Sequence, residues 1–250
     1  MSIGVRLSLG LPPIVPLNPE ILLISDIAAL FYFINWFGKF TLNFCTSLYL
    51  YGMTVDIWAS LEKADQALFE QINGHWTNTF FDSLLPWMRT SEHWFAFYIA
   101  LVGYLFYKWG WKAWKWLLTV AITVALSDQV SSFIFKPFVH RLRPCNDPAL
   151  LNKVNLLIGT CPSSFSFTSS HAANHFSLAM FVFMSLQPLF KKYTYLFFVW
   201  AGIISYAQIY VGVHYPLDIL AGTLIGLLMG YVGAIVYSKW ISVANKHSFK

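Results

Sequence analysis

The sequence predicts an all-α, polytopic membrane protein, a helical bundle of about six transmembrane helices. Of its 250 residues, 57% are hydrophobic and only 11% are charged, whereas soluble domains carry about 25% charged residues. Apolar runs poor in charge follow one another from Glu92 to Trp240. Several of these runs approach the length of about 20 residues that crosses a bilayer as a helix. Because only short interruptions separate them, we expect a single bundle.

The expected spans, in chain order, are residues 27–52, 93–109, 113–135, 171–190, 194–213 and 217–240. The first of these is interrupted by Lys39. Four prolines precede any long apolar run in the first 20 residues, so we expect a loose tail there and no cleaved signal peptide. The expected organisation is a tail with a first span (1–52), an amphipathic segment (53–92), a helical core (93–240) and a cytoplasmic tail (241–250).

The segment before the core is mixed in polarity. Within residues 54–91, apolar side chains recur at helical spacing, which predicts an amphipathic helix; they are Ile57, Trp58, Leu61, Ala64, Leu68 and Phe69. We expect the Asn73-Gly74 pair and Pro86 to break it. Two arrangements fit this pattern equally: a helix lying on the membrane surface, or a polar-faced cap packed on the bundle.

Basic residues predict the orientation. Those expected on one side of alternating spans are Lys108, Lys112, Lys115, Lys191, Lys192, Lys239, Lys246 and Lys250, and this side is expected to be cytoplasmic in the cell (inner) membrane. The opposite face then holds 53–92, 136–170 and 214–216. Four basic residues lie on this face, where the positive-inside rule expects few, and we expect them to take part in the chemistry of the protein: Lys136, Arg141, Arg143 and Lys153.

The formal charge of +5 does not indicate a nucleic-acid partner. The Lys and Arg residues stand at the ends of segments and form no stripe or run, whereas nucleic-acid binding requires a basic patch. The expected partners are the bilayer and a lipid within it.

Three polar clusters fall on the predicted outer face. They are "KPFVHRLRP" (136–144), "FTSSHAANH" (167–175) and "YAQIYVGVHYPLDILAG" (206–222). Three loops from separate helix ends, one carrying fixed positive charge and two carrying histidines, predict a pocket for a multiply charged anion. Free backbone N–H groups at a helix start and the planar fork of arginine both suit phosphate.

Helix geometry gives individual residues a role in this pocket. Ser169 and Ser170 are good N-cap residues before His171, so neighbouring N–H groups are free for an anion. Asp218 stands four residues after His214, and a carboxylate bonded to one ring nitrogen leaves the other free to attack. Pro216 favours a helix start between them.

Two further polar residues allow other interpretations. His171 and His175 have the i, i+4 spacing of metal ligands, but their surroundings are cationic and no carboxylate stands beside them, so we predict no metal site. Asp128 lies within a span and is expected to pair with a neighbouring helix or with Lys136.

Together the three clusters resemble the type-2 phosphatidic-acid phosphatase superfamily over about residues 90 to 240. "KPFVHRLRP" matches K-x6-R-P, "FTSSH" resembles P-S-G-H, and "AQIYVGVHYPLD" resembles S-R-x5-H-x3-D. The resemblance implies hydrolysis of a lipid phosphate or diphosphate without cofactor or metal, at a site facing the outer leaflet. It implies His214 as nucleophile, oriented by Asp218, with His171 as general acid. The implied phosphate-binding residues are Lys136, Arg143, Ser169, Ser170 and Gln208.

The chain departs from this pattern at Thr168, Ser170 and Ala207, and most seriously at Gln208, which stands where the family has a phosphate-clamping arginine. Losing a charge-assisted bond to a developing anion costs on the order of 2–4 kcal/mol in the transition state. His140, Arg141 or His175 could supply the missing charge. Alternatively, the chain transfers phosphate to another acceptor, or binds lipid phosphates without turnover.

A disulfide between Cys145 and Cys161 is compatible with the sequence. Both lie on the loop between the first two clusters, on the predicted outer side where the compartment is oxidising, whereas Cys45 lies far away. Two unpaired thiols in a mobile loop are the other possibility.

Overall fold

The structure is a computed structural model that describes residues 57–150 and 153–247. These residues form helices joined by turns and loops, with no strand among them, so the all-α prediction is confirmed for this part of the chain. The predicted first span, 27–52, and Cys45 lie outside the described residues.

Helices occupy every predicted span from residue 93 onward. The α-helices are α2 (Ile57–Glu70), α3 (Thr79–Arg89), α4 (Phe95–Trp109), α5 (Ala113–Gln129), α6 (Lys136–Val139), α7 (Ser170–Phe190), α8 (Leu196–Tyr210) and α9 (Pro216–His247). Helical turns of π type cover Gln71–His75 and Val130–Phe135, and short 3-10 turns cover Ser91–Trp94, Gly110–Lys112, Pro144–Asn146, Pro148–Leu150 and Lys191–Tyr195. The helix of α9 continues to His247, through most of the residues expected as a tail.

Two described stretches are long and apolar enough to cross a membrane. They are Ser91–Leu150, which contains α4 and α5, and Pro216–Trp240 within α9, with mean hydropathies of 1.6 and 2.2. A count of six spans therefore stays a prediction.

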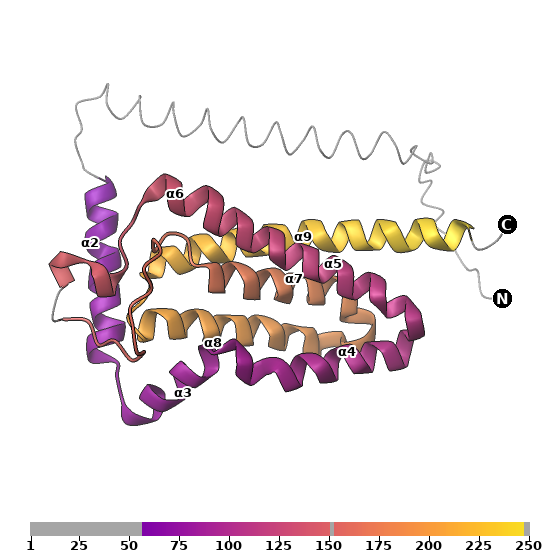
Figure 1. Cartoon of the computed structure of the whole chain (residues 1–250), viewed down its shortest axis with the longest axis horizontal. Helices are drawn as coiled ribbons and strands as arrows, with labels where there is room; N and C mark the ends of the chain where they lie inside the picture. The colour runs from indigo at the N-terminus through magenta and orange to yellow at the C-terminus, as the bar shows by residue number, and fades with distance from the viewer. Residues whose placement is uncertain (1–56, 151–152, 248–250) are drawn as a thin grey trace, which may run out of the picture. The chain divides into compact units, whose positions relative to one another are not determined.

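The long helices run side by side with α2 across one end of the bundle (Figure 1). Helix α7 packs against α5, α8 and α9, and α3 packs against α8. One apolar cluster joins α4, α5, α7 and α9 around Trp116 and Phe181, and a second joins α2, α3 and α8 around Phe69 and Tyr210. The ends of α6 and α8 and the starts of α3, α7 and α9 all lie toward α2 (Figure 1).

Glycines let α9 approach α7 at backbone distance. A Cβ atom added at Gly222, Gly226 or Gly230 would lie within 2.4 Å of a backbone oxygen of α7 or its N-cap. Those oxygens belong to Ser169, Ala173 and Ser177, which repeat with the same four-residue period. Matching small residues on two helices are the usual device for close helix packing in membranes.

Helices α2 and α3 form a cap packed on the bundle. In α2, Asp65 and Phe69 are buried, and the Phe69 ring lies 5.4 Å from that of Tyr215. The expectation that Pro86 breaks the segment is wrong, because Pro86 lies inside α3. A proline there removes one hydrogen bond, and α3 continues to Arg89.

The π turn between α2 and α3 is tied to the core by Asn73. Its Nδ2 donates to the carbonyls of Asn155 (2.8 Å) and Tyr210 (2.7 Å), and its Oδ1 accepts from the Asn155 amide. The Asn73-Gly74 pair thus marks the turn, as expected from the sequence.

Cys145 and Cys161 form a disulfide, with their Cα atoms 5.9 Å apart. This closes the loop between α6 and α7 just after Arg143 and before the segment that leads to His171. A loop of this length is stabilised by about 3 kcal/mol in the chain-entropy model.

We predict that Gly226→Ala separates α7 from α9. Its new methyl would meet the backbone of Ala173 at 2.3 Å, and overpacking of this kind costs about 1–3 kcal/mol. Thermal unfolding of the detergent-solubilised protein should show a lower midpoint than wild type. The matched control is Gly202→Ala in α8, where nothing lies within 4 Å of the added carbon; equal midpoints for the two variants would contradict the close-packing argument.

Candidate active site

The three polar clusters predicted from the sequence meet at the end of the bundle nearest α2 (Figure 1). The first comprises α6 and the residues after it, the second begins α7, and the third spans the turn from α8 into α9. Arg143, Ser169, His214, Gln208 and Asp218 are all buried there. Hydrogen bonds link His214 to Arg143 and Asp218, and a backbone bond runs from Ser169 N to Asp218 O over 3.1 Å.

His214 is held in one orientation by contacts on both ring nitrogens. Its Nδ1 faces Asp218 Oδ2 at 3.4 Å and Ser166 Oγ at 3.3 Å, and its Nε2 faces Arg143 Nη1 at 3.1 Å. A carboxylate accepts and a guanidinium donates, so the proton is assigned to Nδ1 and the lone pair to Nε2. The ring is thereby neutral, with the unprotonated nitrogen at Nε2.

Asp218 is fully buried and has partners on both oxygens. Oδ2 accepts a short hydrogen bond from Ser166 Oγ and one of 2.9 Å from the Tyr215 amide. Oδ1 accepts from Arg141 Nη1 at 2.9 Å. Ser166 has no counterpart in the motifs and was not predicted from the sequence.

Arg141 serves Asp218 and does not replace the missing phosphate clamp. Its Nη2 donates to Asp65 Oδ2 at 2.6 Å, and its guanidinium lies 4.0 Å from the centre of the Tyr215 ring. Burial works to lower the pKa of Arg141, but the charges of Asp218 and Asp65 outweigh burial and raise it. Asp65 also accepts from the Leu217 amide (2.8 Å), so α2 is tied to the start of α9.

Arg143 is fixed by the loop that precedes α7. Nε and Nη2 donate to Ser164 O (2.8 Å) and Oγ (3.0 Å), and Nη1 donates to Val213 O (3.1 Å). Burial lowers the pKa of Arg143 to about 10, so the group stays cationic at neutral pH. Its position beside His214 suits an anion bound at that nitrogen.

The start of α7 provides backbone donors. Ser169 is the N-cap, and its Oγ accepts from the Ala172 amide at 3.4 Å, which leaves the amides of Ser170 and His171 without an intrahelical acceptor. The hydroxyls of Thr168 and Ser170, which replace the proline and glycine of the resembled motif, both bond to Ser131 Oγ, at 2.9 and 3.1 Å.

The rings of His171 and His175 do not point toward one common position, as two ligands of one metal ion would. Their rings are parallel with centroids 6.3 Å apart. His175 Nδ1 bonds to the His171 carbonyl at 2.8 Å, and its ring contacts Trp200 at 4.9 Å. Among residues 57–150 and 153–247, no group of three or more potential metal ligands gathers, and the absence of a metal stays a prediction.

Lys136 and His140 differ in their exposure to solvent. Lys136 is half-buried, and burial lowers its pKa, with the charge of Arg143 acting in the same direction. His140 is exposed and its ring packs edge-on against Phe165 at 4.7 Å, so it does not supply the missing charge. Asp128 pairs with a neighbouring helix, accepting from Asn174 Nδ2 at 3.0 Å.

Gln208 accepts two hydrogen bonds from Arg89, a residue that was not predicted from the sequence. Nε and Nη2 of Arg89 lie 3.3 and 3.2 Å from Gln208 Oε1. Arg89 ends α3 and no motif contains it. One signal could have found it: like Arg141 and Arg143, it is a cation on the face that the basic-residue rule expects to be poor in cations.

The sequence of this chain matches the model of one known protein family. The PAP2 superfamily model matches residues 112–242, which hold all three clusters. The chain belongs to the PAP2 superfamily. Among PAP2 structures, the likeness to the crystal structure of Aquifex aeolicus LpxE has a TM-score of 0.50 at 27% identity, covering 67% of this chain and 93% of that one. A transmembrane PAP2-type phosphatidylglycerolphosphate phosphatase from Bacillus subtilis shares the fold with a TM-score of 0.52 at 20% identity, covering 78% of this chain and 96% of that one.

Two curated relatives in sequence are named as phosphatases of lipid A. A lipid A 4'-phosphatase of Porphyromonas gingivalis is 30% identical over 189 residues, which is 73% of this chain and 78% of the relative. A lipid A 4'-phosphatase of Bacteroides thetaiotaomicron is 32% identical over 161 residues, covering 63% and 69%. The resemblance proposed from the motifs is therefore confirmed at the level of the PAP2 family.

Burial lowers the pKa of His214 to about 4, because the charged ring is poorly solvated; the hydrogen bond to Asp218 opposes this shift and the charge of Arg143 adds to it. We predict that the ring stays neutral as the pH falls from 8 to 5 and takes up a proton only near pH 4. NMR of protein labelled with ¹³C-histidine should show this midpoint, with the signal assigned by its loss in His214→Asn. A midpoint at the ordinary value near 6.5 would contradict the buried arrangement.

Proposed function

We propose that this chain is an integral membrane phosphatase that hydrolyses a phosphomonoester or diphosphate of a lipid through a phosphohistidine intermediate. One observation carries the proposal: His214 is held by Asp218 at Nδ1 and has its other nitrogen 3.1 Å from the guanidinium of Arg143. A neutral imidazole whose unprotonated nitrogen lies beside a fixed cation is a nucleophile aimed at an anion.

In the first step, the lone pair on His214 Nε2 attacks phosphorus, and the bond from phosphorus to the leaving oxygen breaks. His171 gives its proton to that oxygen, so the lipid leaves as an alcohol, or as a lipid phosphate when the substrate is a diphosphate. Asp218 accepts the hydrogen bond from Nδ1–H and stabilises the positive charge that develops on the ring.

In the second step, a water molecule attacks the phosphohistidine. His171, now neutral, takes a proton from the water, and the bond from phosphorus to Nε2 breaks. Inorganic phosphate leaves, and both histidines return to their starting states.

Fixed donors hold the phosphate during both steps. Arg143 and Lys136 supply positive charge, and Ser169 and the amide of Ser170 lie at the start of α7, where anions are favoured. Arg143 Nη1 contacts the lone pair of His214 Nε2. A phosphate that enters the site therefore replaces this contact: Nε2 faces the phosphorus atom, and the guanidinium binds a phosphate oxygen.

We place this site on the extracytoplasmic face of the cell (inner) membrane, in a chain of about six membrane spans. The disulfide between Cys145 and Cys161 beside the site supports an oxidising compartment. The opposite ends of the helices carry the lysine-rich connections after α4 and α7, which supports a cytoplasmic location for them.

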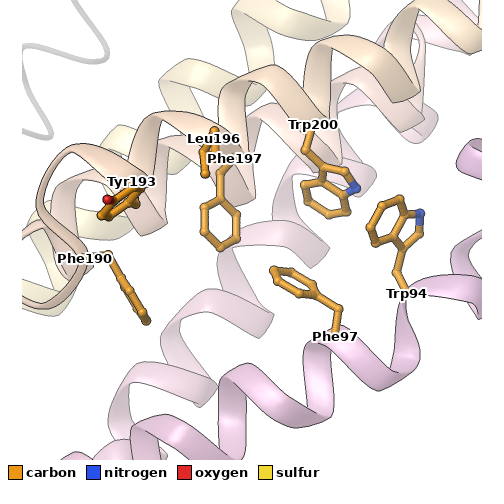
Figure 2. A pocket seen from close by; sticks show the side chains of 7 residues that line it. All are labelled: Trp94, Phe97, Phe190, Tyr193, Leu196, Phe197 and Trp200. Atoms are coloured by element: carbon orange, nitrogen blue, oxygen red, sulfur yellow. The ribbon is translucent and has the colours of Figure 1, made fainter.

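An aromatic cavity along α4 and α8 supports a lipid substrate. It has a volume of about 300 Å³ and lies between α4 and the α7–α8 region, lined by Trp94, Phe97, Phe190, Tyr193, Leu196, Phe197 and Trp200 (Figure 2). Trp200 contacts the ring of His175, whose Nδ1 bonds to the His171 carbonyl. An acyl chain in this cavity would keep its phosphate near His171.

The curated relatives favour a lipid A phosphate as the first substrate to examine. Two of them act on lipid A by name, while a Bacillus subtilis relative, 27% identical over 137 residues, is a phosphatidylglycerophosphatase B. Both kinds of substrate present a phosphomonoester on a lipid, which is the chemistry that the site accommodates.

We predict that His214→Ala abolishes turnover and leaves the fold intact. The purified protein would be incubated with a panel of lipid A, phosphatidylglycerol phosphate, phosphatidate and isoprenyl diphosphate, and free phosphate would be measured. Rapid quenching of the wild type in alkaline denaturant, in which phosphohistidine is stable, should trap a phosphorylated histidine that is absent from the variant. Because His214 is a nucleophile, the expected loss in kcat is at least about 10³-fold.

The control for this experiment is His75→Ala, which removes an exposed histidine from the turn after α2 and should leave turnover unchanged. Full activity of the His214→Ala protein would exclude the mechanism. Labelling of an added acceptor lipid without release of free phosphate would instead assign a phosphotransferase, and neither product would assign a lipid-phosphate binder.

We predict that Leu196→Trp blocks the aromatic cavity. The larger side chain should lower kcat/KM for a phosphatidate with two long acyl chains by about tenfold and leave a short-chain, water-soluble phosphatidate unaffected, since a few buried methylenes account for about 1–3 kcal/mol. Val199→Trp is the matched control, because Val199 lies on the same helix with similar exposure, 58% against 60%, but does not line the cavity. Equal effects on both substrates would show that the cavity does not hold the acyl chain.

A further inference from the structure

Arg89 is a cation at the site that has no role in the steps above. Its guanidinium is half-buried, and burial lowers its pKa, which shows that its charge is poorly solvated. Its hydrogen-bond partner is the neutral amide oxygen of Gln208. In the part of the chain that the structure describes, no carboxylate pairs with it, although Arg141 close by has two.

Arg89 interacts electrostatically with other basic groups of the site. Its charge acts on the imidazole of His171 more than any other charge does, and it acts on Arg143 as well, where Asp218 opposes it. His171 in turn interacts with His214 and Arg143. The charges of these groups therefore repel one another, and an anion bound among them would relieve the repulsion.

Gln208, like Arg89, has a polar group that lacks a suitable partner. The side chain is 0% exposed, and within the described residues its Nε2 has no acceptor. The amide cannot reverse without turning two N–H donors toward the guanidinium, so Arg89 fixes its orientation. A buried donor without an acceptor is destabilising, and an anion oxygen would satisfy it.

We propose that Arg89 binds a phosphate oxygen of the substrate and that Gln208 holds Arg89 in place for it. Nε and Nη2 of Arg89 contact Gln208 Oε1, and Nη1 has no acceptor among the described residues, so it is available to the anion. This inference rests on the proposed phosphatase function. In this proposal, the positive charge that is missing at position 208 is supplied from α3. This helix lies outside the family match of residues 112–242.

Arg89 has a competing structural explanation. It stands in the last turn of α3, where a basic side chain interacts favourably with the helix dipole. That role needs positive charge at the end of α3, but it does not need the charge to be near His171. Moving the guanidinium to another helix therefore separates the two roles.

The test is an exchange of side chains between the two helices. Arg89→Gln should lower kcat/KM about 100-fold, the usual effect of removing one transition-state donor. Gln208→Arg in the same protein, giving R89Q/Q208R, returns one guanidinium and one amide to the same space and should recover at least tenfold over R89Q. Lys108→Gln is the matched control, because Lys108 is the basic residue in the last turn of α4 at the opposite end of the bundle, and it should leave kcat/KM unchanged.

Binding of inorganic orthovanadate, followed by tryptophan fluorescence, gives a readout independent of turnover. Its Kd should rise about 100-fold in R89Q and return toward the wild-type value in R89Q/Q208R. If R89Q keeps wild-type activity and affinity, or if it loses both and the double variant recovers neither, Arg89 has no role in phosphate binding. A wild type that releases no phosphate from any lipid, but binds vanadate in a manner that depends on Arg89, would overturn the phosphatase function and keep the anion site.

Discussion

The buried carboxylate of Asp218 organises this end of the molecule. A charge that is 0% exposed needs partners for its lone pairs, and Asp218 takes them from separate parts of the chain: Ser166 and Arg141 from the loop before α7, and the Tyr215 amide and His214 from its own turn. Removing one partner of a buried ion pair costs on the order of 3–5 kcal/mol because the other charge is left uncompensated. The carboxylate therefore fixes the loop, the nucleophile and the start of α9 relative to one another.

The close contact of α7 with α9 makes this arrangement possible. With glycines at four-residue intervals, the backbone of α9 lies against Ser169, Ala173 and Ser177. At the Ser169 end of this contact, the Ser169 amide donates to the carbonyl of Asp218 at 3.1 Å. The start of α7, which carries His171, and Asp218 on α9 are thus separated by a backbone-to-backbone distance, which side-chain flexibility cannot alter.

The sequence was sufficient for those features whose cause is local. Apolar run lengths predicted where the helices lie, and the i, i+4 spacing across Pro216 predicted that Asp218 reaches His214. Features that depend on distant contacts were not predictable. Ser166 reaches Asp218 over 52 positions, Arg141 reaches Asp65 over 76, and Arg89 reaches Gln208 over 119. The sequence around each of these residues does not indicate its partner, and only packing of the helices brings them together.

The two helices before the core belong to the site, although the family match begins after them at residue 112. Helix α2 brings Asp65 to Arg141 and thereby to Asp218, and α3 brings Arg89 to Gln208. Because position 208 is fully buried, an arginine there would have its whole aliphatic chain buried. Arg89 is only half-buried and lies at a helix end where positive charge is favoured. Helix α3 can carry the charge because Tyr210, two residues after Gln208, donates to Asp82 at 2.7 Å and so keeps α3 against α8. The position of the cation then depends on how α3 packs, and the interface of α3 with α8 becomes part of the phosphate site.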